Sequence, residues 1–345
     1  MNKILEVKNI SKRFGNIQAL RDVSFDVEKG EFVFIVAHTN AGKSTLLKII
    51  AGILEPDEGE IYIEGENITK TPPWERPVGY MPQTYALFPH MTVLENVMFG
   101  PIHRGLDREE AIEKAQKYIE LVGLKDWEKA YPHELSGGMQ QRVALARVLA
   151  VEPKIILLDE PLSALDALLR VRLRGEIKKI LKGKTVLWVT HDQEGAMSLA
   201  DKLIVMRSGR IVAVGNAMEL YYKPPSLYVA HFLGEINFIE SVAHGGFVQI
   251  LDTKVSTDKI GPVVIGIRPE DIKIVKNNSS PLGRVKELRF VSGFWRLLVD
   301  VEGIDLVVYS LKRIRSKEVS LRIRPEDVLV FDYPPEGIRR AVHLE

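Results

Sequence analysis

The run from Phe32 to Thr45 combines an apolar strand, a tight loop and the start of a helix. Its spacing follows the pattern GxxxxGK[ST], in which backbone N–H groups at a helix N-terminus surround phosphate groups. In that pattern the lysine reaches the outer phosphates and the hydroxyl holds Mg2+, roles that here fall to Lys43 and Ser44. The segment therefore predicts a phosphate-binding loop between a strand and a helix.

The loop departs from the pattern at its first position and at its apex. Ala37 stands where the pattern has glycine, and His38 and Asn40 replace smaller residues. Asparagine adopts a left-handed backbone more readily than most residues, whereas alanine does not. If position 37 requires a positive φ, Ala37 costs about 1 kcal/mol or more. Two possibilities stay open: an active loop, and one that holds phosphate poorly.

Length and composition limit the protein classes. With 345 residues the chain is long enough for two domains. The formal net charge is +1, which argues against a nucleic-acid binder. The absence of cysteine excludes disulfides and thiolate metal sites. Apolar runs are all too short for a membrane-spanning helix, so any membrane role comes through a partner.

Polar residues follow further strand patterns. The apolar run 155–158 predicts a central parallel strand, and Asp159 and Glu160 come directly after it. His191 ends a second buried run, and Gln83 follows a shorter one. Because parallel strands end at one sheet edge, we expect Glu160 and His191 beside the phosphate-binding loop. Asp159 is suited to hold Mg2+, and Glu160 to deprotonate water for attack on a γ-phosphate.

Two weaker features also have ordinary structural explanations. Phe14 is either a packing residue or an aromatic plane that stacks on adenine. Ser136, Gly137 and Gly138 precede an amphipathic helix, where serine caps the helix and the glycines let a phosphate approach. Taken alone, the second feature is a Ser-capped turn.

In this order, the motifs resemble those of the nucleotide-binding subunit of an ATP-binding cassette (ABC) transporter, across residues 1–235. The resemblance implies an α/β P-loop ATPase domain with a mixed sheet and a helical subdomain at about residues 85–152. It implies binding of ATP and Mg2+ and hydrolysis of ATP. Met139 departs mildly from the commonest signature residue. For nucleotide binding, the resemblance implies Phe14 against adenine and a Walker A loop made of Ala37, His38, Thr39, Asn40, Ala41, Gly42, Lys43, Ser44 and Thr45. For catalysis it implies Gln83 in the Q-loop, Asp159 in Walker B, Glu160 as catalytic base and His191 as the switch histidine, with Ser44, Gln83 and Asp159 around Mg2+. It also implies a signature with Ser136, Gly137, Gly138 and Gln140, and a D-loop from Ser163 to Asp166.

The same resemblance implies a head-to-tail homodimer, in which Ser136 and Gly138 of one chain contact the γ-phosphate held by Lys43 of the other. Two transmembrane permease subunits would receive this peripheral ATPase at the cytoplasmic face of the cell membrane, and a solute-binding protein would act indirectly. We expect the loop 85–89 to form part of the permease-facing surface. A non-transport ABC ATPase is the alternative, but the tandem cassettes, heptad arms and basic tracts typical of that class are not visible in the sequence.

From residue 236 to 345 the pattern changes to short strands with frequent Gly and Pro, which predicts an all-β domain, an OB-like or TOBE-like barrel. The sequence RPED at 268–271 recurs at 324–327, and we expect two similar turns. The segment resembles the C-terminal domain of importer ATPases for sugars, polyamines, iron, sulfate or molybdate. In that family the domain contacts its twin or binds regulators; a plain dimer spacer is the alternative.

Overall fold

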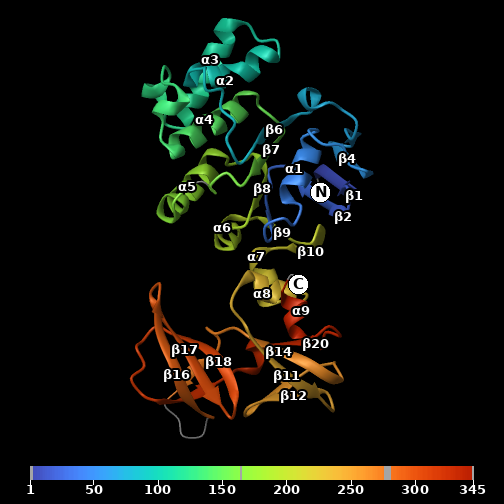
Figure 1. Cartoon of the computed structure of the whole chain (residues 1–345), viewed down its shortest axis with the longest axis vertical. Helices are drawn as coiled ribbons and strands as arrows, with labels where there is room; N and C mark the ends of the chain where they lie inside the picture. The colour runs from blue at the N-terminus through green and yellow to red at the C-terminus, as the bar shows by residue number, and fades with distance from the viewer. Residues whose placement is uncertain (1–2, 164, 276–280, 344–345) are drawn as a thin grey trace. The chain divides into compact units, whose positions relative to one another are not determined.

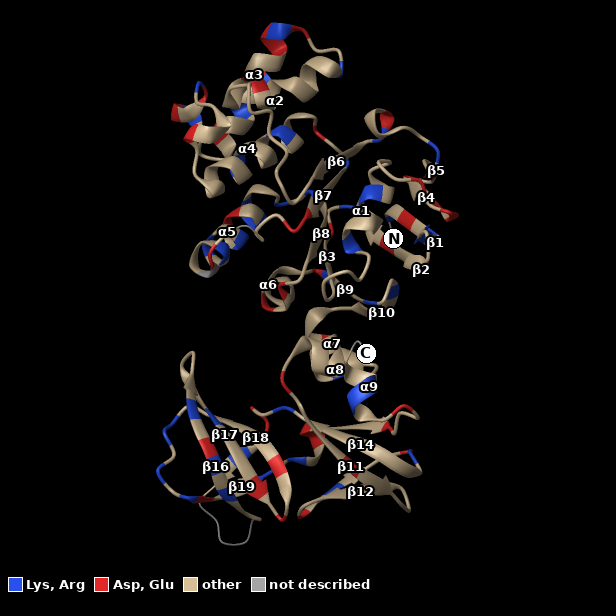
Figure 2. Ribbon diagram, in the orientation of Figure 1, with Lys and Arg blue, Asp and Glu red and all other residues tan. Residues whose placement is uncertain are grey.

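The computed structural model describes residues 3–163, 165–275 and 281–343, so Ala164 of the expected D-loop lies outside the described residues. The chain divides into two compact units, Met1–Met218 and Glu219–Glu345. The first combines strands with helices and the second consists mainly of strands (Figure 1). Basic and acidic residues are interspersed over both units (Figure 2), in keeping with the net charge of +1.

A six-stranded sheet forms the centre of the first unit, in the order β10-β9-β3-β8-β7-β6. Strands β3, β8 and β7 are parallel neighbours, and every residue in them is buried. Such continuous apolar strands need cover on both faces. The edge strand β10 runs antiparallel, which makes the sheet mixed. The strands are β3 (Phe32–Val36), β6 (Val78–Met81), β7 (Ile155–Asp159), β8 (Thr185–Thr190), β9 (Lys202–Arg207) and β10 (Arg210–Gly215).

A second, antiparallel sheet has the order β2-β1-β4-β5. Its long strands β1 and β2 stay paired up to the turn after Phe14, and β-bulges shift the register of that pairing at several points. One hydrophobic core joins this sheet to the first helix and the central sheet. The strands are β1 (Lys3–Phe14), β2 (Ile17–Glu28), β4 (Glu58–Ile63) and β5 (Glu66–Asn67).

Helices α2, α3 and α4 gather into a helical subdomain at one end of the first unit (Figure 1). Side chains cap each N-terminus: Thr92 in a capping box, Asp107 and Ser136. In the described part of the chain, no helix is long and apolar enough to cross a membrane. The helices of this unit are α1 (Lys43–Ile50), α2 (Val93–His103), α3 (Arg108–Leu121), α4 (Gly137–Ala150), α5 (Ala167–Ile180) and α6 (Gln193–Leu199); α7 (Ala217–Tyr222) spans the division between the units.

The all-β C-terminal region expected from the sequence is confirmed. Its described strands form sheets of three, two and five strands, in the orders β11-β14-β20, β12-β13 and β15-β19-β16-β17-β18, and these share one hydrophobic core. The elements are β11 (Asn237–Ala243), β12 (Phe247–Ile250), β13 (Thr253–Ser256), β14 (Gly261–Ile267), β15 (Lys273–Val275), β16 (Leu282–Val291), β17 (Phe294–Val301), β18 (Ile304–Ser310), β19 (Glu318–Arg322), β20 (Val328–Asp332), α8 (Leu227–Leu233) and α9 (Ile338–Val342).

The two RPED sequences form similar turns, as expected. In each, the aspartate N–H donates to the arginine carbonyl three residues earlier at 3.0 Å, in Asp271 to Arg268 and in Asp327 to Arg324. Their arginines differ, since Arg268 is buried and donates to the carbonyls of Ala230 and Gly234 at 2.8 and 2.9 Å. Arg268 thus fixes α8 to the strands, which is why the compact unit begins before the strand pattern does.

Candidate functional site

Strands β3, β7 and β8 are neighbours, and the residues that follow their C-terminal ends lie close together. Lys43 Nζ is 3.9 Å from Glu160 Oε1, and His191 Nδ1 is 2.9 Å from Glu160 Oε2. The Ser44 hydroxyl donates to Asp159 Oδ1 at 2.8 Å. Five residues from three distant parts of the chain therefore form one cluster at the sheet edge where α/β proteins bind ligands.

Lys43 is buried and folded back onto its own loop. Its ammonium donates to the carbonyls of Ala37 and His38, both at 3.0 Å. Burial lowers the pKa of Lys43, and the negative charges of Glu160 and then Asp159 oppose that shift. The loop thus holds a desolvated cation within reach of its own backbone, in a position to meet an anion.

The backbone conformation of the loop shows whether alanine is strained at position 37. Ala37 is buried and does not have a positive φ, so alanine causes no left-handed strain there. The left-handed positions are Asn40, at φ 64°, and Gly42, at φ 92°. A Cβ on Gly42 would lie 2.4 Å from the carbonyl oxygen of Ala19, so glycine is required there for space as well as for conformation. The remaining apex residues, His38 and Thr39, are exposed, whereas Ala41 is buried and Thr45 is half-buried.

Oxygen ligands for a hard cation are available at Ser44 and Asp159. Asp159 is buried, and its second oxygen accepts a hydrogen bond from the Tyr80 hydroxyl at 3.0 Å. Burial, and next the charge of Asp159, raise the pKa of Tyr80, so this hydroxyl stays a donor. Among the described residues no group of three or more His, Cys, Asp or Glu side chains converges on one point. A hydroxyl and one carboxylate suit Mg2+, which keeps further ligands from water and phosphate.

Glu160 is buried and has a left-handed backbone, with φ 47°. Such a conformation is strained in a residue other than glycine, and it persists only where the surrounding structure maintains it. His191 is half exposed, with 51% of its side chain accessible, and it contacts Glu160 from the end of β8. One side of the Glu160 carboxylate therefore faces Lys43 and the other faces the imidazole.

Gln83 lies near this cluster without joining it. Its side chain is exposed and donates to the Ser163 hydroxyl at 3.1 Å, and that hydroxyl donates to the Glu160 carbonyl at 2.9 Å. Tyr85, expected on a partner-facing surface, is instead buried, and its hydroxyl donates to the Pro161 carbonyl at 3.2 Å. The Tyr85 ring therefore packs inward, and the permease-facing surface expected at the loop 85–89 stays a prediction for the other residues of that loop.

The signature residues keep to their own segment. Ser136 accepts the Met139 N–H at 3.4 Å, and the Gln140 amide donates to the carbonyls of Pro132 and Leu135 at 2.9 and 3.2 Å. Ser136 and Gly137 are exposed and Gly138 is half-buried. The helix N-terminus that these residues form is thus open to solvent within one chain.

The remaining two expected residues lie elsewhere in the first unit. Phe14 is 45% exposed at the end of β1, with Lys12 Nζ 5.8 Å from its ring centroid, so it is available for stacking rather than packed in the core. Asp166 caps α5 by accepting the Leu169 N–H at 2.9 Å.

Several residues of the site carried no signal in the sequence. Tyr80 is one alternating residue of a short strand, yet it contacts Asp159. Arg147, in the last turn of α4, donates to the carbonyls of Tyr85 and Ala86 at 2.7 and 2.8 Å. Arg174 forms an ion pair with Asp192, the residue after the histidine. Each contact joins segments distant in the chain, so no local spacing could reveal it.

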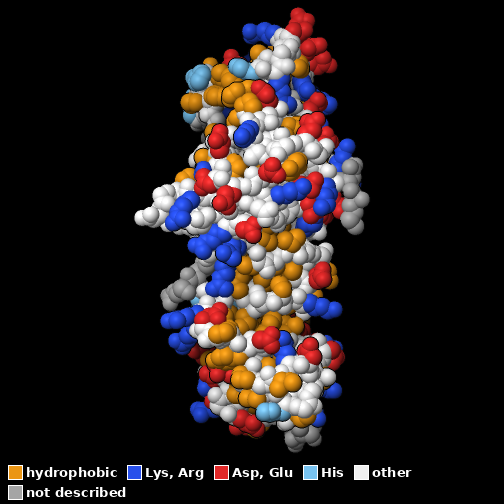
Figure 3. Space-filling view, turned by 90° about the vertical axis from the view of Figure 1, so that its right-hand side faces the viewer, with side chains coloured by type: hydrophobic (Ala, Val, Ile, Leu, Met, Phe, Trp, Pro, Cys, Tyr) orange, Lys and Arg blue, Asp and Glu red, His pale blue; other side chains and the backbone are white. Residues whose placement is uncertain are grey.

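An aromatic cluster marks one surface of the helical subdomain. Phe88 lies 4.6 Å from Phe99 between ring centroids, Phe99 lies 4.0 Å from His103, and Phe88 lies 6.2 Å from His90. Both histidines are exposed. Figure 3 shows histidine and hydrophobic side chains gathered near this end of the first unit.

Comparisons with known proteins agree with this geometry. The ABC transporter family model matches residues 20–163. The chain is 40% identical over 345 residues to a molybdate/tungstate import ATP-binding protein of Pyrococcus horikoshii, covering 97% of this chain and 99% of that one. It is 39% identical to a spermidine/putrescine import ATP-binding protein of Bacteroides thetaiotaomicron, covering 95% of this chain and 73% of that one.

A solved structure is similar as well. It is a dimeric ATP-binding cassette in a post-hydrolysis state with ADP and phosphate, 33% identical to this chain, with a TM-score of 0.56 over 62% of this chain and 99% of that one. The fold, the clustered site and the similarity along nearly the whole length agree. The chain belongs to the ABC transporter family and is one of its ATP-binding, ATP-hydrolysing subunits.

Proposed function

We propose that this chain couples ATP hydrolysis to the import of a solute, as a homodimer bound to two membrane permease subunits. The observation that carries the proposal is the cluster of Lys43, Ser44, Asp159, Glu160 and His191 at one sheet edge. Similarity to import ATP-binding proteins along nearly the whole chain supports the transport role.

The P-loop holds the phosphates of ATP. Lys43 leaves the carbonyls of Ala37 and His38 to contact the outer phosphates, and backbone N–H groups at the start of α1 bind the others. The Phe14 ring stacks on adenine. We assign Mg2+ to Ser44 and Asp159, with Gln83 reaching the same place by moving from Ser163. When bound, Mg2+ neutralises charge on the β- and γ-phosphate oxygens.

Glu160 acts as the base in hydrolysis. A water molecule attacks the γ-phosphorus, its O–H proton passes to a Glu160 oxygen, and the bond from phosphorus to the β,γ-bridging oxygen breaks. His191 orients the carboxylate through the contact between Nδ1 and Oε2. Lys43 stabilises the charge that develops on the transferred phosphoryl group.

The signature completes the site from a second chain. Within one protomer, Ser136 and Gly138 lie at a solvent-exposed helix N-terminus, which favours an anion brought by another molecule. The dimeric cassette among the similar structures supports this arrangement. ATP then joins two chains, and its hydrolysis separates them.

The aromatic cluster is the part of the surface that we assign to the permease. The loop before it is tied to the catalytic cluster, because Arg147 holds the carbonyls of Tyr85 and Ala86 while the Tyr85 hydroxyl contacts the Pro161 carbonyl. A change at Glu160 therefore has a short physical path to this surface. The protein would sit at the cytoplasmic face of the membrane, with a solute-binding protein acting indirectly.

The atypical loop does not favour impaired hydrolysis, since Ala37 has no left-handed strain and Asn40 tolerates its conformation. The relatives import chemically different solutes, an oxyanion in one case and a polyamine in the other. We therefore assign solute choice to the membrane and solute-binding partners.

Steady-state ATP hydrolysis with Mg2+ tests the proposal. Glu160→Gln should lower the rate at least about 100-fold, whereas Glu109→Gln, on an exposed position of α3, should leave it unchanged. Copurification with membrane permease subunits from the native cell tests the transport role. A wild-type rate equal to that of Glu160→Gln would overturn the enzymatic part, and an active ATPase that copurifies with no membrane protein would overturn the transport part.

A further inference from the structure

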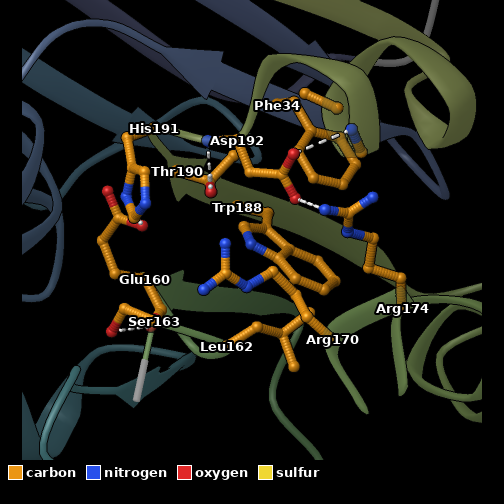
Figure 4. Close-up of a pocket in the computed structure, with 12 residues that line it drawn as sticks. Phe34, Glu160, Leu162, Ser163, Arg170, Arg174, Trp188, Thr190, His191 and Asp192 are labelled. Carbon is orange, nitrogen blue, oxygen red and sulfur yellow. Dashed lines mark hydrogen bonds and ion pairs between the residues drawn. The ribbon is translucent and has the colours of Figure 1, made fainter. Parts of the chain in front are cut away.

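A small cavity adjoins the catalytic pair. Glu160 and His191 line one side, and Arg170, Arg174 and Asp192 line the other, around the Trp188 ring (Figure 4). The volume that the centre of a water molecule can occupy in this cavity is only about 10 Å³. That volume holds one water at most, so the cavity is too small to bind a larger ligand.

Asp192 connects α5 to the turn between β8 and α6 that carries His191, here called the histidine turn. One of its oxygens pairs with Arg174 Nη2, and the other accepts the Gly195 N–H at 3.1 Å to cap α6. Its own N–H donates to the Thr190 hydroxyl at 3.0 Å. The residues on both sides of His191 are therefore fixed, and the ion pair is 84% buried at both partners, with 16% of each side chain exposed.

Gly195 shows how closely the pair fits. A Cβ at this position would lie 2.5 Å from Arg174 Nε and 2.5 Å from Asp192 Oδ2. Its φ is not left-handed, so glycine is needed for space and not for conformation. The chain leaves room at α6 for the arginine of α5.

The N-terminus of α5 directly follows the D-loop. Asp166 caps this helix, and Arg170 Nη2 donates to the Leu165 carbonyl at 3.1 Å. Arg170 and Arg174 are four residues apart in the sequence and so lie on one face of the helix. A single rigid helix thus holds the D-loop with one arginine and the histidine turn with the next.

We propose that Arg174 is a positioning residue for hydrolysis: with Asp192 it sets His191 against Glu160 and makes that geometry depend on the position of the D-loop. The inference rests on the proposed function, since it assigns His191 and Glu160 to the reaction. Moving α5, as closure of a second chain on the D-loop would, moves the histidine turn with it. Losing the ion pair frees His191 while the P-loop stays intact.

The test uses Arg174→Gln, Asp192→Asn and the double variant in the full chain. Asparagine still caps α6, so Asp192→Asn removes the charge and keeps the turn. Arg172→Gln, on the same helix with 77% of its side chain exposed, is the matched control. We expect kcat to fall roughly 10- to 100-fold in each single variant, with the Kd for a fluorescent ATP analogue unchanged within about twofold.

The double variant should be no slower than either single one, because the two groups act as a unit. Arg174→Lys, which keeps the charge, should recover part of kcat. Unchanged kcat in both single variants, losses that multiply in the double variant, or a rise in Kd equal to the loss of kcat would each overturn the inference. A wild-type chain that hydrolyses no ATP would instead refute the proposed function.

Discussion

The two halves of the proposed catalytic centre differ in how far one chain completes them. On the P-loop side, Lys43, Ser44, Asp159, Glu160 and His191 are linked by hydrogen bonds and ion pairs, and three of the five are buried. On the signature side, the hydrogen bonds of Ser136 and Gln140 stay within their own segment. The first half is preorganised by the fold, whereas the second is a solvent-exposed helix end that needs a partner.

This difference has a physical reason. A buried cation and two carboxylates are stable only when they pair, so the fold must bring them together before any ligand arrives. An exposed helix N-terminus is solvated by water and needs no partner for stability. Substitutions on the two sides should therefore fail in different ways, and they should complement each other.

The largest expected effect is complementation between two inactive variants. Lys43→Ala removes the ammonium group that would contact the phosphates, and Gly138→Asp places a negative charge where the γ-phosphate held by the other chain would bind. A Cβ at position 138 would meet only ordinary contacts of 3.6 and 3.7 Å, so the fold should tolerate the aspartate. Each variant alone should lose ATPase activity at least about 100-fold. An equal mixture, after subunit exchange, should regain about a quarter of wild-type activity, because half of the dimers carry one intact site. A mixture as inactive as its components would show that both halves act within one chain.

Removal of the Ser44 hydroxyl, which we assign as a ligand of Mg2+, should affect only the P-loop half of the site. Ser44→Ala should reduce hydrolysis about tenfold or more and raise the Mg2+ concentration that half-saturates the rate, because one oxygen ligand is lost. EDTA should abolish hydrolysis in the wild type. Titration of Mg2+ at fixed ATP measures both effects, and an unchanged Mg2+ requirement in Ser44→Ala would refute the assignment.

Tyr80→Phe should have a moderate effect, since it removes one hydrogen bond to Asp159 and keeps the ring. We expect hydrolysis to fall several-fold, and the free energy of unfolding to fall by about 1 kcal/mol at pH 7. Burial raises the folded-state pKa of Tyr80 above its ordinary value of 10.0, so the wild type loses the tyrosine's contribution as pH rises above about 10. Denaturant unfolding at pH 7 and above pH 10 checks this, and an identical alkaline loss in Tyr80→Phe would contradict it.

The smallest effect is expected at the two atypical positions of the phosphate-binding loop, its first position and its apex. Ala37→Gly and Asn40→Gly should each stay within about twofold of wild-type kcat, because neither native residue is strained at its observed φ. The comparison uses the same ATPase assay with Glu160→Gln as the blank. A large gain in rate from either glycine would show that the loop limits the enzyme.

The sequence by itself determined the local chemistry. The continuous apolar runs of β3, β7 and β8 predicted buried parallel strands, and the polar residues after them predicted which side chains meet. The serine before α4 predicted its cap, and the repeated RPED predicted two similar turns. Each of these depends on residues adjacent or regularly spaced in the chain, so a local pattern carries the information.

Only the tertiary structure decided what those local features touch. Two identical RPED turns place one arginine in a buried cap on α8 and leave the other paired with Asp327 at the surface. The tertiary structure likewise determines the φ of Ala37, the inward position of Tyr85 and the ion pair between Arg174 and Asp192. Burial and charge pairing join segments far apart in the chain, and their geometry depends on the whole fold rather than on any local pattern.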